Sequence, residues 1–222
     1  MPARLVASPA RAAMLGLSRP AVLLAVALAL TAALALTACS GAAPAAPAPA
    51  AVGTSPGAVL AYRVQASGQS YPFVVSVRQN GADGIAFGFD LGDGSRVGTV
   101  QMSAAAVESA VLMQNTFGAT DYRLSDKTSV WLARGPFARL RRGETVALNI
   151  AGGPDNEDFA GGCGETFSVD TAGGASYAVP ACRFTAGNQS LVVADDLRQP
   201  LILSMDTGRF RVELQTAMPA GR

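Results

Sequence analysis

The sequence contains no histidine and only one lysine, Lys127, among its 222 residues. The absence of histidine excludes Ser-His-Asp triads, histidine-ligated zinc and the usual side-chain pH switch near neutrality. Charged residues make up only 15% of the chain, with 17 basic and 16 acidic side chains. Because proteins dedicated to nucleic acids usually carry a strong basic excess, this balance indicates a chain without a nucleic-acid partner.

Motifs for nucleophilic catalysis are also missing. The chain has no Gly-x-Ser-x-Gly sequence, and Lys127 lies two residues from both Ser125 and Ser129 instead of at the Ser-x-x-Lys spacing. Carboxylates are therefore the only acid–base candidates. We predict that the protein is not an enzyme and uses no cofactor.

The first 60 residues carry charge only at Arg4, Arg11 and Arg19, and 18 residues of Ala, Val, Leu and Thr follow at Ala21–Ala38. The length of this run is close to the ~20 residues that a membrane-spanning helix needs. A basic start, an apolar middle and small residues at the end are also typical of a secretion signal. Hydropathy alone leaves both interpretations open.

The run ends in Leu36-Thr37-Ala38-Cys39, which resembles the lipobox of bacterial lipoproteins. This resemblance implies that Cys39 is acylated and that the chain is cut immediately before it. In that family an Asp after the cysteine favours retention at the inner membrane. Ser40 therefore implies an outer-membrane protein facing the periplasm, or the outer face of the plasma membrane where no outer membrane exists. The alternative is an uncleaved anchor helix with an incidental cysteine.

The residues after Cys39 have the composition of a spacer. Gly41–Gly57 contains no charge and four prolines, so it favours extended, semi-rigid conformations and cannot bury a core. The expected organisation is a signal peptide over 1–38, a lipidated cysteine with an Ala/Pro-rich tether over 39–57, and a single β-rich envelope domain over 58–222.

The domain over 58–222 shows short runs rich in valine and aromatic residues, separated by Gly, Asn and Asp. This spacing predicts an all-β, mainly antiparallel fold, either a β-sandwich or a partly closed barrel, with one or two short helices. Ser103 is expected to cap a helix that ends near Asn115, and Gly135-Pro136 to open a single helical turn. The expected strands are Ala58–Gln65, Pro72–Gln79, Gly84–Leu91, Val97–Met102, Thr128–Ala133, Thr145–Ile150, Glu165–Asp170, Ser176–Phe184, Ser190–Ala194, Leu201–Asp206 and Arg209–Thr216.

The chain has three cysteines, and two of them remain free to pair once Cys39 carries lipid. Outside the cytosol Cys163 and Cys182 are then expected to form a disulfide, which stabilises the fold by roughly 3 kcal/mol in the chain-entropy model. The bond would join a turn over Gly161–Gly164 to the strand around Cys182. The alternative is two unpaired buried thiols. Two cysteines without histidine fall short of a zinc site, and we predict no metal centre.

Charged residues gather at three further places. A candidate binding patch of four arginines could contact lipid phosphates, cell-wall carboxylates or an acidic partner, although a solvated face is the favoured interpretation. An acidic loop could offer oxygen ligands to calcium, but it lacks the EF-hand spacing and is expected to be solvated. Asp90 is expected in a turn, and so are Asp195 and Asp196, which are adjacent to one another in the sequence. The patch comprises Arg134, Arg139, Arg141 and Arg142, and the loop contains Asp155, Glu157 and Asp158.

Together these features favour a membrane-anchored cell-envelope lipoprotein that binds or supports something and catalyses nothing. Its expected partners are the bilayer, through Cys39, and an envelope protein or cell-wall component. One alternative is a carrier of a hydrophobic molecule in an open β-barrel, which an apolar cavity would favour. Another is a carboxylate-dependent cell-wall hydrolase. The run Thr128–Leu132 faintly resembles uncharacterised exported bacterial β proteins, and this resemblance implies no activity.

Overall fold

The computed structural model describes residues 52–92 and 94–221. These residues belong to one compact unit. Cys39, the expected signal peptide and most of the expected tether lie outside the described residues, so the lipoprotein hypothesis stays a prediction. Within the described ranges, no helix combines the length and the apolar character that crossing a bilayer requires.

The described part of the chain contains thirteen strands and two short helices, which confirms the predicted all-β class. The first half comprises β1 (Val59–Ala66), β2 (Gln69–Gly81), β3 (Gly84–Asp90), β4 (Val97–Ser103), α1 (Ala104–Ser109), β5 (Leu112–Met113), β6 (Tyr122–Leu124) and β7 (Lys127–Thr128). The second half comprises α2 (Arg134–Arg141), β8 (Val146–Leu148), β9 (Glu157–Asp170), β10 (Ser176–Ala186), β11 (Gln189–Ala194), β12 (Ile202–Asp206) and β13 (Phe210–Met218).

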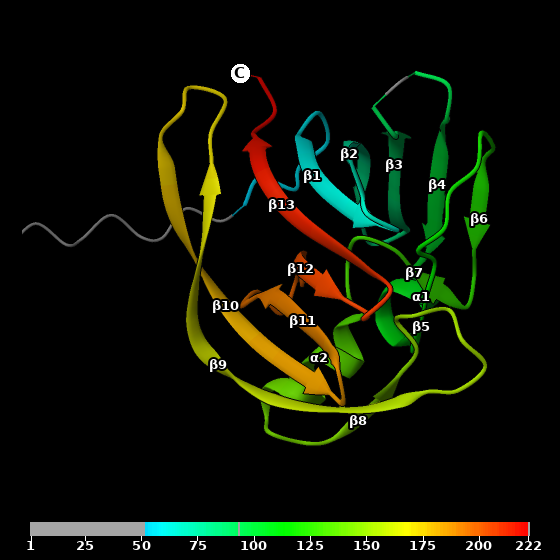
Figure 1. Cartoon of the computed structure of the whole chain (residues 1–222), viewed down its shortest axis with the longest axis vertical. Coiled ribbons are helices and arrows are strands. Elements are labelled where there is room, and N and C mark those ends of the chain that lie inside the picture. The colour runs from blue at the N-terminus through cyan, green and yellow to red at the C-terminus, as the bar shows by residue number, and fades with distance from the viewer. Residues whose placement is uncertain (1–51, 93, 222) are drawn as a thin grey trace, which may run out of the picture. The chain divides into compact units, whose positions relative to one another are not determined.

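Eleven strands form one sheet in the order β6-β4-β3-β2-β1-β13-β12-β11-β10-β9-β8. Neighbouring long strands pair antiparallel, as hairpins joined by short turns do. β9 also reaches β13 through the parallel pair Thr216↔Asp170, so strands β9 to β13 close into a ring. Figure 1 shows β9 and β10 as the long curved ribbon that forms one side of this ring, while β1 to β6 continue the sheet away from it. The arrangement is a partly closed barrel.

Two large hydrophobic clusters pack against this sheet. The larger lies against β1 to β4 and includes Leu60, Val75, Phe87 and Trp131. The second lies within the ring, where α2 contributes Phe137 and Leu140, and Phe137 meets Phe184 of β10 edge to face. A strand turns alternate side chains to opposite faces, and β11 and β12 are buried on both faces, so these two strands contribute to both clusters.

The strand and helix predictions need four corrections. The expected Gly161–Gly164 turn lies inside β9, where cross-strand pairing with β10 overrides the flexibility of glycine. The helix capped by Ser103 ends at Ser109 and not near Asn115. The strand expected over Thr128–Ala133 is interrupted because Val130 has a φ of 67°, outside the β region. The Gly135-Pro136 turn belongs to the eight-residue helix α2, longer than a single turn.

Candidate functional site

An apolar cavity of about 280 Å³ lies against the sheet. This volume lies close to the lower end of the roughly 300–1,000 Å³ typical of small-molecule pockets. Strands β1, β2, β12 and β13 form one wall, and two segments that cross over the sheet, 113–117 and 129–130, form the other. The cavity is lined by Tyr62, Val64, Ala66, Tyr71, Phe73, Leu91, Arg96, Met113, Gln114, Asn115, Thr116, Phe117, Ser129, Val130, Ile202, Met205, Phe210 and Val212.

The strand wall follows from alternation of side chains along β1. Tyr62, Val64 and Ala66 are two residues apart and all line the cavity, whereas Arg63 and Gln65 between them are exposed on the opposite face. Phe73 of β2 lies opposite Tyr62 in the register, with the two ring centroids 6.0 Å apart. The same pleat that builds the core therefore builds this wall.

The segment 113–117 is held over the sheet by the side-chain amide of Asn115 and by a cluster of aromatic rings. Asn115 Nδ2 donates to the carbonyl of Ile150 at 2.6 Å. Phe117 packs on Phe73 and Phe89, with ring centroids 5.1 Å and 5.0 Å apart, and meets Tyr122 edge to face. Aromatic pairs at these distances contribute beyond their buried area, so the segment forms a firm second wall.

Val130 is the strained point of the cavity wall. Its φ of 67° is a left-handed conformation that a β-branched residue rarely adopts. The strain is held in place because Val130 accepts a hydrogen bond from Ile202 N at 2.8 Å, while Leu132 N donates to Pro200. Two buried side-chain atoms beside it, Thr128 Oγ1 and Trp131 Nε1, have no hydrogen-bond partner. Strain and unsatisfied polar groups of this kind concentrate at functional sites.

Tyr62 contributes a buried hydroxyl-bearing side chain to the cavity wall. Its hydroxyl donates to the carbonyl of Ile202 at 3.0 Å, which ties β1 to β12. Burial raises the pKa of Tyr62 far above its ordinary value because the phenolate would lose its hydration. The side chain is therefore a neutral phenol at physiological pH and leaves the inner cavity uncharged.

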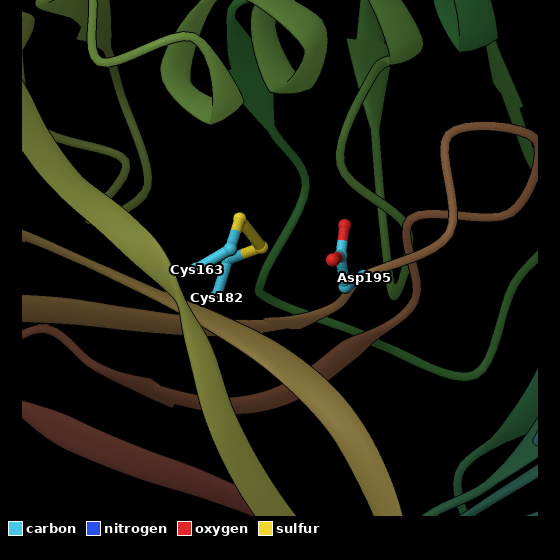
Figure 2. Close-up of side chains that lie close together, drawn as sticks. All are labelled: Cys163, Cys182 and Asp195. Atoms are coloured by element: carbon cyan, nitrogen blue, oxygen red, sulfur yellow. A yellow bond between two sulfur atoms is a disulfide. The ribbon is translucent and has the colours of Figure 1, made fainter. Parts of the chain in front are cut away.

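The disulfide predicted from the sequence is present, between Cys163 of β9 and Cys182 of β10. The two residues lie directly opposite one another in the register, which places their side chains on the same face. Figure 2 shows Asp195 beside them, and its carboxylate and the two sulfur atoms lie within 4.8 Å of one another. Metal ligation requires thiolates, so the bonded sulfurs offer no such ligands while the disulfide is intact.

The four arginines of the candidate binding patch lie on or beside α2, and each contacts an acceptor of the same domain. Arg139 and Arg142 both donate to Glu144 at 2.9 Å and 2.7 Å, and these hydrogen bonds lower the pKa of Glu144. Arg141 pairs with Asp195 at 2.6 Å. Arg134 donates to the carbonyl of Arg198 at 3.0 Å. The positive charge of this surface is therefore largely balanced internally.

The acidic residues singled out in the sequence are not among those that line the cavity. Asp90 Oδ1 accepts from Gly92 N and Asp196 Oδ1 from Arg198 N, so both close turns as expected. Asp155 and Glu157 border a separate polar hollow next to β8. Among the described residues, the cavity lining includes no Asp or Glu.

Comparison of this chain with protein-family models, curated proteins and solved structures gives no match. The cavity is therefore a candidate binding site on the grounds of its geometry alone. The sequence indicated a cavity only as an alternative, and no residue was assigned to its lining. The alternation of Tyr62, Val64 and Ala66 was a usable signal for one wall, but the opposite wall comes from residues that carry no strand or helix pattern.

Proposed function

We propose that this protein is a lipid-anchored cell-envelope protein that binds a small apolar molecule non-catalytically in the cavity of its partly closed barrel. The observation that carries the proposal is the cavity itself, because its inner lining consists mainly of Val, Ile, Met and aromatic side chains. Small-molecule sites typically combine such a lining with a few polar groups that orient the ligand.

Energetics favour an apolar occupant. Burying apolar ligand surface contributes roughly 25 cal/mol per Å², and the neutral Tyr62 phenol leaves no buried charge to oppose that transfer. Val130 adds a second argument, since its left-handed backbone lies at the cavity wall. A ligand that contacts this segment and lets its backbone relax would gain part of the strain energy as binding free energy. The absence of carboxylates from the lining gives no support to a hydrolytic role there.

Quenching of tryptophan fluorescence tests this proposal on the full-length chain in nanodiscs. Trp131 is the single tryptophan and follows Val130 of the cavity wall. A bromine atom quenches tryptophan only at short range, so a brominated hydrocarbon in the cavity should quench Trp131, while one dissolved in the bilayer should not reach this buried ring.

Filling the cavity provides the matched comparison. Ala66→Phe places a ring inside the cavity, whereas Ala61→Phe makes the same change on the same strand but outside the lining. We expect quenching in the parent and in Ala61→Phe, and its loss in Ala66→Phe. Equal quenching in all three chains, or none in the parent, would overturn the proposal.

The anchor is tested separately, because Cys39 lies outside the described residues. Radiolabelled palmitate should appear on the parent chain and be absent from Cys39→Ala. Mass spectrometry should find a mature chain that begins at an acylated Cys39. An unlabelled parent chain, or a mature chain that retains residues 1–38, would refute the lipoprotein assignment without bearing on the cavity.

A further inference from the structure

Arg96 is the single charged residue of the cavity lining. It lies in the connection between β3 and β4, at the end of the cavity that also contains Leu91 and Tyr71. Arg96 and Thr116 are the two exposed members of the lining, and the others are buried or half-buried. The cavity therefore runs from an apolar interior to a rim that carries one positive charge.

The position of the Arg96 guanidinium is set by Tyr71. Its central carbon lies 5.5 Å from the centre of the Tyr71 ring, within cation–π range. A guanidinium stacked in this way keeps its N–H groups at the edge of its plane, where they can donate two parallel hydrogen bonds to a carboxylate or phosphate. Within the described residues, Arg96 forms no ion pair with an acidic side chain.

This differs from the arginines near α2. Arg139, Arg141 and Arg142 all donate to carboxylates of their own domain. Arg96 instead stacks on an aromatic ring beside an apolar cavity, which is the arrangement expected of a side chain that receives an anion from outside.

We infer that the ligand is a single-chain amphiphile whose anionic oxygens bind Arg96 while its apolar chain lies between Val64 and Val130. The inference rests on the proposed function and adds the chemical class of the ligand to it. A carboxylate and a phosphate monoester share the required chemistry, because both present paired anionic oxygens to the guanidinium edge. Thr116, the other exposed residue of the lining, carries a hydroxyl that can donate to an anionic oxygen.

Matched brominated probes of equal chain length test the headgroup on the full-length chain in zwitterionic nanodiscs, again through quenching of Trp131. The four probes are a fatty acid, an alkyl phosphate, an alcohol and an alkylamine. We expect one or both anionic probes to bind about fivefold more tightly than the alcohol, and the amine to bind more weakly than the alcohol. Which anion binds tighter identifies the headgroup.

Arg96→Gln should abolish the preference for the anionic probes over the alcohol. Arg63→Gln removes the same charge from the solvent face of β1 and should change nothing, which separates a local contact from the effect of net charge. Tyr71→Phe should keep the preference because the ring remains, while Tyr71→Leu should reduce it, as expected of a positioning residue.

The outcomes separate the two claims. If the alcohol binds and the anions bind no better, or if Arg96→Gln keeps the anion preference, the headgroup inference is wrong and the apolar cavity proposal stands. If no probe quenches Trp131 in the parent chain, the proposed function fails as well.

Discussion

Val130 is the residue at which the local conformational preference and the tertiary fold disagree. Its φ of 67° costs of order 1–3 kcal/mol, and the strand pairing of 130–132 with 200–202 holds it there. A valine fills this position because its side chain is buried against the cavity. The backbone and side-chain contributions to stability can therefore be separated by substitution.

Val130→Gly should destabilise the fold much less than Val64→Gly. Both valines are buried and line the cavity, but only Val130 is left-handed. Losing a buried valine side chain for glycine costs about 3 kcal/mol. At Val130 the relief of strain offsets most of this, so the expected cost is about 1 kcal/mol. Equal losses of unfolding free energy in urea would show that the backbone of Val130 is not strained.

Tyr62 makes stability sensitive to alkaline pH. Its folded-state pKa is raised by burial, so above pH ~10 the unfolded chain loses the phenolic proton while the folded chain keeps it. The contribution of this group is therefore complete below pH ~10 and falls by up to about 1.4 kcal/mol per pH unit above it. Unfolding free energies measured from pH 8 to 11 should fall less steeply in Tyr62→Phe. An unchanged slope would contradict the burial of the neutral phenol.

Residue-scale predictions from the sequence succeeded where the cause is local. Ser103 accepts from Ala106 N at 3.1 Å as a helix cap, and Asp196 closes its turn, because both residues bond within three positions. The left-handed Val130 was not predictable, since its cause is pairing with a segment about 70 residues away.

At the scale of elements, β9 is the strand that differs most from its sequence-based prediction. Its sequence contains Gly161, Gly162 and Gly164, which predicted a turn, yet it is a 14-residue strand. Gly161 fits because a Cβ there would lie 2.0 Å from the carbonyl of Arg183 across the pair. Gly161 thus permits close approach of β9 and β10, whereas a Cβ at Gly162 or Gly164 would meet no neighbouring atom. Hydrophobic alternation located most other strands, and errors gathered where glycine or strained backbone altered the local pattern.

The disulfide should matter most for this ribbon. Its cysteines are 19 positions apart, and the chain-entropy model gives about 3 kcal/mol for a loop of that size. Chemical unfolding of the parent with and without a phosphine reductant should show this loss. The double variant Cys163→Ser, Cys182→Ala should match the reduced parent and ignore the reductant. An unaffected parent would mean that cross-strand pairing alone fixes the β9–β10 ribbon.

At the scale of the molecule, the sequence predicted the fold class and the disulfide but not the site. The cavity joins residues from β1, β2, β12 and β13 with two irregular segments, so its lining is assembled from positions between 62 and 212. Periodicity reports which residues face a core, and it does not distinguish a filled core from a hollow one. The cavity exists because segments 113–117 and 129–130 pack over the sheet without filling the space beneath them.

Photo-crosslinking measures most directly whether that space holds a ligand. A single-chain amphiphile with a diazirine at its apolar end, bound to the full-length chain in membranes and irradiated, should modify the inner lining at Val64, Met113, Val130 or Met205. Ala66→Phe should remove these adducts and Ala61→Phe should keep them. Adducts confined to residues outside the lining, or unaffected by Ala66→Phe, would contradict the account.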